Sequence, residues 1–318
     1  MPTTTDLFPD IIGQAKAKKK LAFYHDGFGS TRVVPNLMFI APKGCGKTTL
    51  AKAFAKNLVL RGEDKPKKFL ELNCSSVKNV QQFFDGVVMP YIDGKDVTVL
   101  FDEASEFVRD LTMSLLTITN PNKDKRTSFT SPEGYTVNFD FRRVTFLFAT
   151  SEPHKVFHAL MDRLERIELE DYSYDDLGKI VEMNIGENIE FEDGVLEEVA
   201  PTLRGNARAA QKIADNFLSH LKGRERFSKK DWTEYKETFD VLPFGLSEGE
   251  LKIMRILREC KECSLTNLAA KTGLTVEAIR RDAEMYLQRM NLIEIRQRGR
   301  ALTPAGMSYL RKVEGGEK

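Results

Sequence analysis

The chain has 318 residues, of which 41% are hydrophobic and 30% charged, and this composition is typical of a folded globular protein. The formal net charge of +1 excludes a globally basic protein, so any nucleic-acid binding must come from local patches. No apolar run approaches the roughly 20 residues that a membrane-spanning helix requires, and the N-terminus lacks signal-peptide character. We therefore expect a cytoplasmic protein of about two or three domains that does not interact with membranes.

A glycine-rich loop, residues 41–49, separates an apolar run from a helical pattern. The run Leu37–Ile40 predicts a strand, and the residues from Leu50 onward predict a helix. Strand, loop and helix in this order form a phosphate-binding P-loop, because the loop N–H groups and the helix N-terminus converge on one point. The pattern departs from the usual one at its first position, which is Ala41 rather than Gly. We predict a nucleotide-binding loop whose contacts are Gly44, Cys45, Gly46, Lys47, Thr48 and Thr49.

Two acidic residues follow a second apolar run, which ends at Phe101. In a P-loop ATPase, Lys47 would reach the β- and γ-phosphates of ATP, and the Thr48 hydroxyl would help to hold Mg²⁺. Asp102 would hold the same Mg²⁺ through water, and Glu103 would orient and polarise the attacking water. The alternative is that Asp102 and Glu103 are solvated residues at the end of a strand and have no role in catalysis. Because the pair follows a P-loop in a chain of alternating strands and helices, we predict hydrolysis as well as binding.

The next segments predict a strand and a helix, then a β-hairpin, then a further strand. Residues 68–73 predict a strand and residues 77–87 a helix. Residues 119–140 alternate in polarity around the turn sequence Ser-Pro-Glu-Gly, which predicts a hairpin. Residues 143–150 predict a strand that ends in Thr150 and Ser151. A hydroxyl there could contact the γ-phosphate or the attacking water, or it could cap the next turn.

The C-terminal part predicts a winged helix. Ser247 and Glu250 form a capping box before one helix, a second helix ends at Gly273, and a third spans residues 275–290. Two short strands then flank the basic turn Arg298-Gly-Arg300. Such modules bind either protein or DNA, and a cluster of arginines at a tight turn favours phosphate and minor-groove contacts. We predict sequence-independent DNA binding through Arg296, Arg298, Arg300, Arg280 and Arg281.

The four cysteines are Cys45, Cys74, Cys260 and Cys263. The last two have the spacing of zinc ligands, but no second Cys or His pair near them in the sequence completes a tetrahedral site. We therefore expect reduced thiols rather than a metal centre.

Taken in order, these motifs resemble the AAA+ superfamily and, more narrowly, the RuvB family of Holliday-junction branch-migration motors. The resemblance covers almost the whole chain. It rests on segments similar to the RuvB adenine contact, sensor 1, arginine finger, lid start and sensor 2, which are residues 8–14, 140–151, 160–164, 170–177 and 203–208.

The resemblance implies roles for further residues. Ile11, Ile12 and Tyr172 would lie near the adenine, and Ser151, which aligns better than Thr150, would be the sensor-1 residue. Arg208 would be the sensor-2 arginine on the γ-phosphate, unless it is an ordinary solvated helix residue.

A finger arginine acts in trans, because it enters the neighbouring subunit's site and stabilises transition-state charge. Arg163 is the expected finger and Arg166 the fallback. The alternative for Arg163 is a surface residue paired with Asp162 or Glu165.

The implied fold is α/β: a parallel sheet flanked by helices, then an all-α lid and a winged helix. We expect an AAA+ ATPase domain at residues 1–171, which includes the hairpin, a lid at residues 172–243 and a winged-helix domain at residues 244–318. The implied function is ATP-driven movement of duplex DNA through a homo-hexameric ring, which moves Holliday junctions. The hairpin would dock a RuvA-like junction-binding protein.

Two other functions share these motifs. A clamp-loader-like or protein-remodelling ATPase would not need the wing arginines, and an ATP-switched DNA-binding initiator or regulator would not need both Glu103 and Arg163. The sequence departs from RuvB at Lys43, at Ala104-Ser105 and at Glu152-Pro153. These departures indicate a divergent member, for which a phage or mobile element is one candidate source.

Overall fold

The computed structural model describes residues 7–32, 34–59, 65–122, 126, 129–130, 136–137 and 139–315. They form two compact units. Unit 1 contains the chain up to Asn184 together with Gly205–Asp215, and unit 2 contains Ile185–Arg204 and the chain from Asn216. The division passes through the predicted lid, residues 172–243, and leaves the start of that segment with unit 1.

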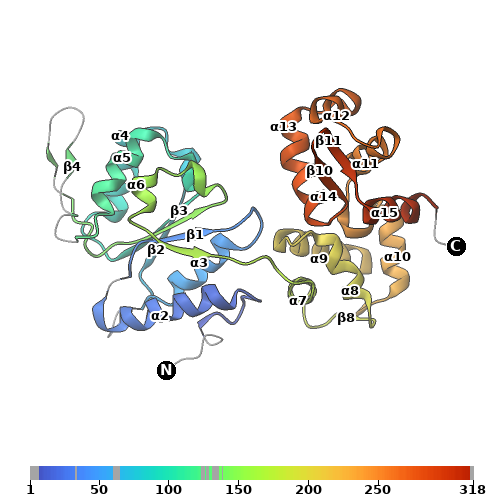
Figure 1. The fold of residues 1–318 in the computed structure, drawn as a ribbon. Coiled ribbons are helices and arrows are strands. Elements are labelled where there is room, and N and C mark those ends of the chain that lie inside the picture. The colour runs from blue at the N-terminus through green and yellow to red at the C-terminus, as the bar shows by residue number, and fades with distance from the viewer. Residues whose placement is uncertain are drawn as a thin grey trace. The chain divides into compact units, whose positions relative to one another are not determined.

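Unit 1 is built on a parallel five-stranded sheet with the strand order β2–β3–β6–β1–β7 (Figure 1). The predicted strands at four of these places are confirmed. The fifth, β7, was not predicted because it carries one apolar residue among three charged ones, as suits an exposed edge strand. The strands are β1 (Leu37–Ile40), β2 (Lys68–Asn73), β3 (Val97–Asp102), β6 (Thr145–Thr150) and β7 (Glu165–Glu168).

Apolar side chains project from both faces of this sheet, because successive residues of a strand point in opposite directions. In β6, Phe146 and Phe148 join one core, which also contains residues of α4 and α5. Leu147 and Ala149 join the other core, which contains residues of α2 and α3. The helices are α2 (Ala15–Thr31), α3 (Lys47–Lys56), α4 (Val80–Phe83), α5 (Arg109–Ile118), α6 (His158–Met161) and α7 (Tyr174–Ile185).

Two predicted elements of unit 1 differ in detail. The helix expected at residues 77–87 begins at Val80 and widens into a π-helix, Phe84–Ile92, that contains Pro90. Proline has no N–H for the regular i→i−4 bond, which accounts for the irregular winding. In the predicted hairpin, β4 (Phe129–Thr130) pairs antiparallel with β5 (Thr136–Val137), and the turn between them lies outside the described residues.

The lid part of unit 2 packs around aromatic side chains. The segment was expected to be all-α, but β8 (Glu190–Phe191) and β9 (Arg226–Phe227) form a short parallel pair. Their ring contacts extend to the helices through Phe217, Trp232 and Tyr235. The helices are α8 (Val195–Val199), α9 (Ala207–Leu221), which continues from unit 1, and α10 (Lys229–Thr238).

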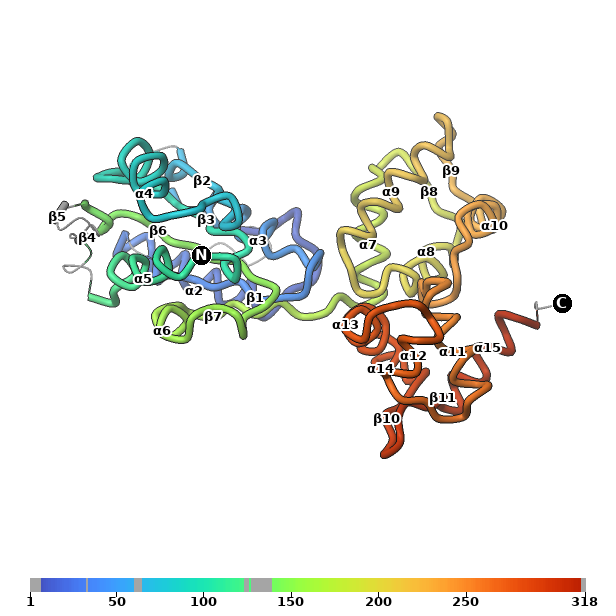
Figure 2. The backbone as a smooth tube through the Cα atoms, turned by 90° about the horizontal axis from the view of Figure 1, so that it is seen from above, coloured from blue at the N-terminus to red at the C-terminus, as the bar shows by residue number. Residues whose placement is uncertain are grey.

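The C-terminal part of unit 2 is a winged helix, as predicted. The capping box of Ser247 and Glu250 is present, and Gly273 ends the second helix with a φ of 78°. The third helix contains a π-helical turn, Ile279–Glu284, between α13 and α14. Figure 2 shows β10 and β11 projecting from these helices. The elements are α11 (Glu248–Cys260), α12 (Leu265–Thr272), α13 (Val276–Ala278), α14 (Met285–Arg289), β10 (Ile293–Arg296), β11 (Gly299–Leu302) and α15 (Pro304–Gly315).

One ion pair joins the two parts of unit 2. Arg204, at the end of the lid segment, donates to both carboxylate oxygens of Glu250 at 2.9 and 3.1 Å. Its guanidinium also lies 3.7 Å from the ring centre of Tyr286. Glu250 is 2% exposed and also accepts from the backbone N–H of Ser247, so its charge is compensated on two sides.

Candidate functional site

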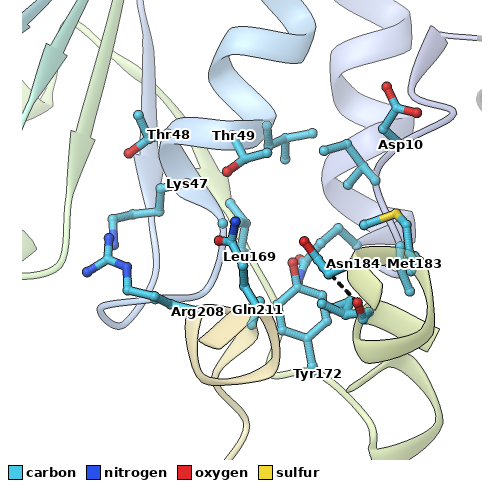
Figure 3. Close-up of a pocket in the computed structure, with 18 residues that line it drawn as sticks. Asp10, Lys47, Thr48, Thr49, Leu169, Tyr172, Met183, Asn184, Arg208 and Gln211 are labelled. Atoms are coloured by element: carbon cyan, nitrogen blue, oxygen red, sulfur yellow. Dashed lines mark hydrogen bonds between the residues drawn. The ribbon is translucent and has the colours of Figure 1, made fainter. Parts of the chain in front are cut away.

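A cavity of about 390 Å³ lies beside the P-loop and is lined entirely by residues of unit 1 (Figure 3). Most of the predicted nucleotide contacts line it: Ile11, Ile12, Gly44, Gly46, Lys47, Thr48, Thr49, Tyr172 and Arg208. Sequence reasoning missed Asp10, Leu169, Met183, Asn184 and Gln211, which also line it. Asp10 belongs to the segment of residues 8–14, whose resemblance to an adenine contact was the signal that could have found it, whereas only the fold brings the other four to the loop.

Cys45 is the predicted loop contact that does not line this cavity. Its side chain is 3% exposed and packs in the core behind the loop, with its sulfur 3.9 Å from the carbonyl oxygen of Gly205. Its backbone carbonyl accepts a hydrogen bond of 3.4 Å from the Tyr172 hydroxyl. Cys45 therefore supports the loop from behind, and only its backbone faces the pocket side.

The P-loop has the backbone geometry of a phosphate cradle. Gly44 and Gly46 have φ values of 81° and 85°, in the left-handed region that favours glycine. Lys47, the first residue of α3, donates to the carbonyl oxygens of Ala41 and Pro42 at 2.8 and 3.0 Å. Burial lowers the pKa of Lys47, and the nearby guanidinium of Arg208 adds to that effect. Phosphate oxygens at this point would restore the stability of its charged form.

Residues 205–208 form the opposite wall of the cradle. The Arg208 N–H donates to the Gly44 carbonyl at 3.2 Å. The side-chain oxygen of Asn206 caps α9 by accepting from the N–H groups of Arg208 and Ala209 at 2.9 and 3.2 Å. Asn206 also lies so close to Gly44 that a Cβ on that glycine would sit 2.1 Å from the Asn206 oxygen. Asn206 was not predicted, because only the folded loop shows this contact.

The apolar end of the cavity is held in place by Gln14. Its side-chain amide forms two hydrogen bonds with the backbone of Glu170, at 2.8 and 2.9 Å. This pair fixes the segment with Ile11 and Ile12 against the chain that leads to Tyr172. The result is a half-buried apolar surface at one end of a polar cradle, which suits a planar base joined to phosphates.

The ends of β3 and β6 bring the predicted polar residues to the same edge of the sheet. Asp102 accepts a 2.9 Å hydrogen bond from the Thr48 hydroxyl. Glu103 follows with a φ of 56° and an exposed side chain. Thr150 is fully buried, and its hydroxyl accepts from the Glu152 N–H at 3.0 Å, while Ser151 is partly exposed. Thr150 therefore caps the turn, and Ser151 stays the predicted contact of the two.

Arg163 and Arg166 lie outside the P-loop cavity. Arg163 follows α6, and its guanidinium donates to the Ala159 carbonyl at 2.6 Å. Its Nε is buried without a partner among the described residues. Asp162, an alternative partner for Arg163, lies 3.0 Å from His158. Arg166 is an exposed residue of β7.

The wing departs from the prediction at Arg300. The turn consists of residues 297–298, and Arg300 lies inside β11. Its guanidinium donates to both carboxylate oxygens of the buried Glu284 at 2.7 and 3.1 Å, and its side chain is only 17% exposed. Arg300 thus forms a largely buried ion pair, which disfavours a DNA contact, and its predicted role in DNA binding stays a prediction. The sequence could not show this pair because Glu284 is distant along the chain.

The other predicted DNA contacts remain at the surface. Arg296 and Arg298 are exposed on the wing, as are Arg280 and Arg281 on the third helix. Arg296 pairs with Glu294, and Arg281 lies 3.0 Å from Asp282. Exposed pairs of this kind are weak, so phosphate groups can compete for these guanidinium groups.

Comparisons with known proteins agree with both the P-loop site and the winged helix. Residues 37–172 match the ATPase family associated with various cellular activities (AAA), and residues 243–311 match the RuvB C-terminal winged helix domain. The Holliday junction branch migration complex subunit RuvB of Mycoplasmopsis pulmonis is 24% identical over 96% of this chain and 96% of its own length. That of Thermosipho melanesiensis is 25% identical over 95% and 96%. The chain is therefore similar to RuvB proteins over nearly its full length, at low identity.

The solved structure of the Thermotoga maritima RuvB Holliday junction branch migration motor has the same fold. It superposes with a TM-score of 0.74 at 21% identity and covers 94% of this chain and 95% of its own. The chain thus combines a segment that matches the AAA family with a segment that matches the RuvB winged helix. These bacterial relatives give no support to a phage origin. No helix among the described residues is long and apolar enough to cross a membrane.

Proposed function

We propose that this RuvB-like protein uses ATP hydrolysis to move double-stranded DNA and thereby drives branch migration of Holliday junctions. The observation that carries the proposal is that one chain combines a formed P-loop cavity with a RuvB-type winged helix. Relatives whose names state this activity match nearly the full length of the chain. The exposed wing arginines favour DNA over a protein substrate.

ATP would occupy the cavity with its base beside Ile11, Ile12 and Tyr172. Its phosphates would meet the loop N–H groups and two cations, Lys47 and Arg208. Figure 3 shows the ends of these two side chains close together. Their positive charges repel in the absence of an anion, which supports an anionic ligand between them.

The residues at the sheet edge fit a Mg²⁺ ion. The Thr48 hydroxyl and the Asp102 carboxylate lie 2.9 Å apart, and both offer the oxygen ligands that Mg²⁺ requires. When bound, Mg²⁺ would neutralise charge that develops on the β- and γ-phosphates. Glu103 would orient the attacking water, and Ser151, rather than Thr150, would hold that water or the γ-phosphate.

The site would be completed by a neighbouring subunit. Arg163 is not among the residues that line the cavity of its own chain, which supports a role in trans within a homo-hexamer. Arg166 on β7 is the second candidate. Hydrolysis in one subunit would then depend on its neighbour, as a motor that works around a ring requires.

The remaining parts would contact DNA and a partner. Arg296, Arg298, Arg280 and Arg281 would bind the DNA backbone without reading its sequence. The hairpin of residues 119–140 would dock a RuvA-like protein. We also propose that the ATPase domain ends at residue 171 and the lid at residue 243. The protein would act in the cytoplasm.

The test is Glu103→Gln, assayed for ATP binding and for hydrolysis with and without a four-way DNA junction. We expect binding to persist and hydrolysis to fall by about 10²–10⁴-fold, the usual contribution of a positioned acid–base group. Glu106→Gln is the matched control, because Glu106 is an exposed glutamate three residues further on. Equal hydrolysis in both variants would contradict the mechanism. Hydrolysis that junction DNA does not stimulate would favour a protein-remodelling ATPase.

A further inference from the structure

Cys260, Cys263 and Lys271 form a cluster in unit 2 that the proposed ATPase site does not use. Cys260 is the last residue of α11 and is partly exposed, whereas Cys263 is 4% exposed. The Lys271 ammonium, on α12, donates to the Cys260 sulfur at 3.2 Å. The thiolate is the reactive form of cysteine, and a neighbouring lysine is one of the environments that produce it.

The second thiol lies next to the first. Burial raises the pKa of the Cys263 thiol, and the charge of Cys260 and a hydrogen bond with it act in the same direction. The buried Cys263 thiol therefore lies within hydrogen-bonding reach of the partly exposed Cys260 sulfur, which has the Lys271 ammonium beside it. Among the described residues, no group of three possible metal ligands includes the pair.

The loop that carries these cysteines is bonded to the wing. The N–H of Cys263 donates to the Arg300 carbonyl at 2.9 Å, and the N–H of Arg300 donates to the Cys263 carbonyl at 2.8 Å. Glu262 accepts from the Arg298 N–H at 2.8 Å. The backbones of Gly299 and Cys263 are so close that a Cβ on Gly299 would lie 2.2 Å from the carbonyl oxygen of Cys263. A displacement of the loop must therefore move the wing.

The same loop contains a strained residue. Lys261 has φ 62° and ψ −47°, a conformation that residues with a side chain rarely adopt. The surrounding contacts must hold it there. A new covalent bond across this residue would redistribute the strain, and Cys263, which is hydrogen-bonded to Arg300, lies two residues further along the chain.

We infer that Cys260 and Cys263 are a reversible dithiol pair whose oxidation by a peroxide shifts the wing. In the first step the Cys260 thiolate attacks one peroxide oxygen, the O–O bond breaks, and the departing hydroxide or alkoxide takes a proton from solvent. Cys260 becomes a sulfenic acid, oxidised by two electrons. The Cys263 thiol then attacks that sulfur, so that a disulfide forms and one water leaves. A dithiol reductant reverses both steps in sum. The consequence for DNA binding rests on the proposed function.

The first experiment treats the full chain with hydrogen peroxide and analyses alkylated peptides by mass spectrometry. We expect the peptide that contains both cysteines to lose two hydrogen atoms and to regain them with dithiothreitol. Lys271→Met should slow this reaction by about tenfold, because it removes the ammonium group that donates to the Cys260 sulfur. Lys252→Met is the matched control, since Lys252 bonds the Thr272 carbonyl and not a sulfur. Absence of the disulfide, or equal rates in both variants, would overturn the inference.

The second experiment separates the coupling from DNA binding. Hydrogen exchange at the amides of Arg298 and Arg300 should accelerate after oxidation, whereas exchange at Phe148 in unit 1 should not change. Unchanged exchange at the wing would overturn the coupling. Both readouts work without DNA, so a protein that oxidises as expected but never binds a junction would contradict only the proposed function.

Discussion

Replacement of Gly44 by alanine tests the contact between the P-loop and α9. At a φ of 81° an alanine costs about 1–2 kcal/mol in backbone strain. Its methyl group would lie 2.1 Å from the side-chain oxygen of Asn206, so Asn206 must move. Asn206 then loses its cap on α9, which costs about 1 kcal/mol. We expect the free energy of unfolding of unit 1 to fall by about 2–3 kcal/mol.

The effects of Gly44→Ala and Asn206→Ala on the free energy of unfolding should not be additive. Asn206→Ala alone gives up the cap and costs about 1 kcal/mol. In the double variant the cap is already gone and the clash is relieved, so its cost stays near that of Gly44→Ala. The coupling energy from this double-mutant cycle is therefore about 1 kcal/mol. Gly46→Ala is the matched control, since Gly46 has a φ of 85° and faces Tyr172 rather than Asn206.

Unfolding of unit 1 can be followed through Cys74, which is fully buried in its core. The measurement is alkylation of this thiol as a function of urea concentration, with peptide-level detection. The site of labelling lies on a different core from the P-loop, so the substitutions do not alter the probe. Strictly additive changes in the free energy of unfolding for Gly44→Ala and Asn206→Ala would refute the contact between these two residues. A coupling energy between Gly46→Ala and Asn206→Ala would show that the effect is not specific to Gly44.

Three further predictions concern buried charges and the wing. Burial lowers the pKa of Lys67 from its ordinary 10.5 to about 8, so the unfolded chain binds more protons between these values. Stability of unit 1 should therefore rise with pH from about 8 to 10.5, and Lys67→Met should remove that rise from the urea curves; a persistent rise would contradict it. Arg204→Ala removes the cation that pairs with the buried Glu250 carboxylate and should lower the free energy of unfolding of unit 2 by about 3 kcal/mol, followed by tryptophan fluorescence; an unchanged free energy of unfolding would contradict this prediction. Arg298→Ala should reduce the salt slope of junction binding by about 1, while Arg300→Ala should lower stability and leave that slope unchanged, and the reverse pattern would restore Arg300 as a DNA contact.

The sequence by itself determined the parts whose chemistry is local. A P-loop needs its glycines, Lys47 and Thr48 next to one another, because one turn of backbone makes the cradle. The apolar run before Ala41 and the one that ends at Phe101 form parallel strands. These were predictable because a strand that is buried on both faces must be apolar along its length, which is a local property of the sequence. The capping box at Ser247 likewise needs only two residues three apart.

Only the tertiary structure decided which distant residues meet. It placed Asn206 against Gly44, Glu284 against Arg300 and Lys271 against Cys260, and no spacing along the chain encodes these pairs. An arginine at a wing looks the same in the sequence whether it faces solvent or a buried carboxylate. The difference lies in packing, because burial makes a charge costly unless a partner from elsewhere in the chain compensates it.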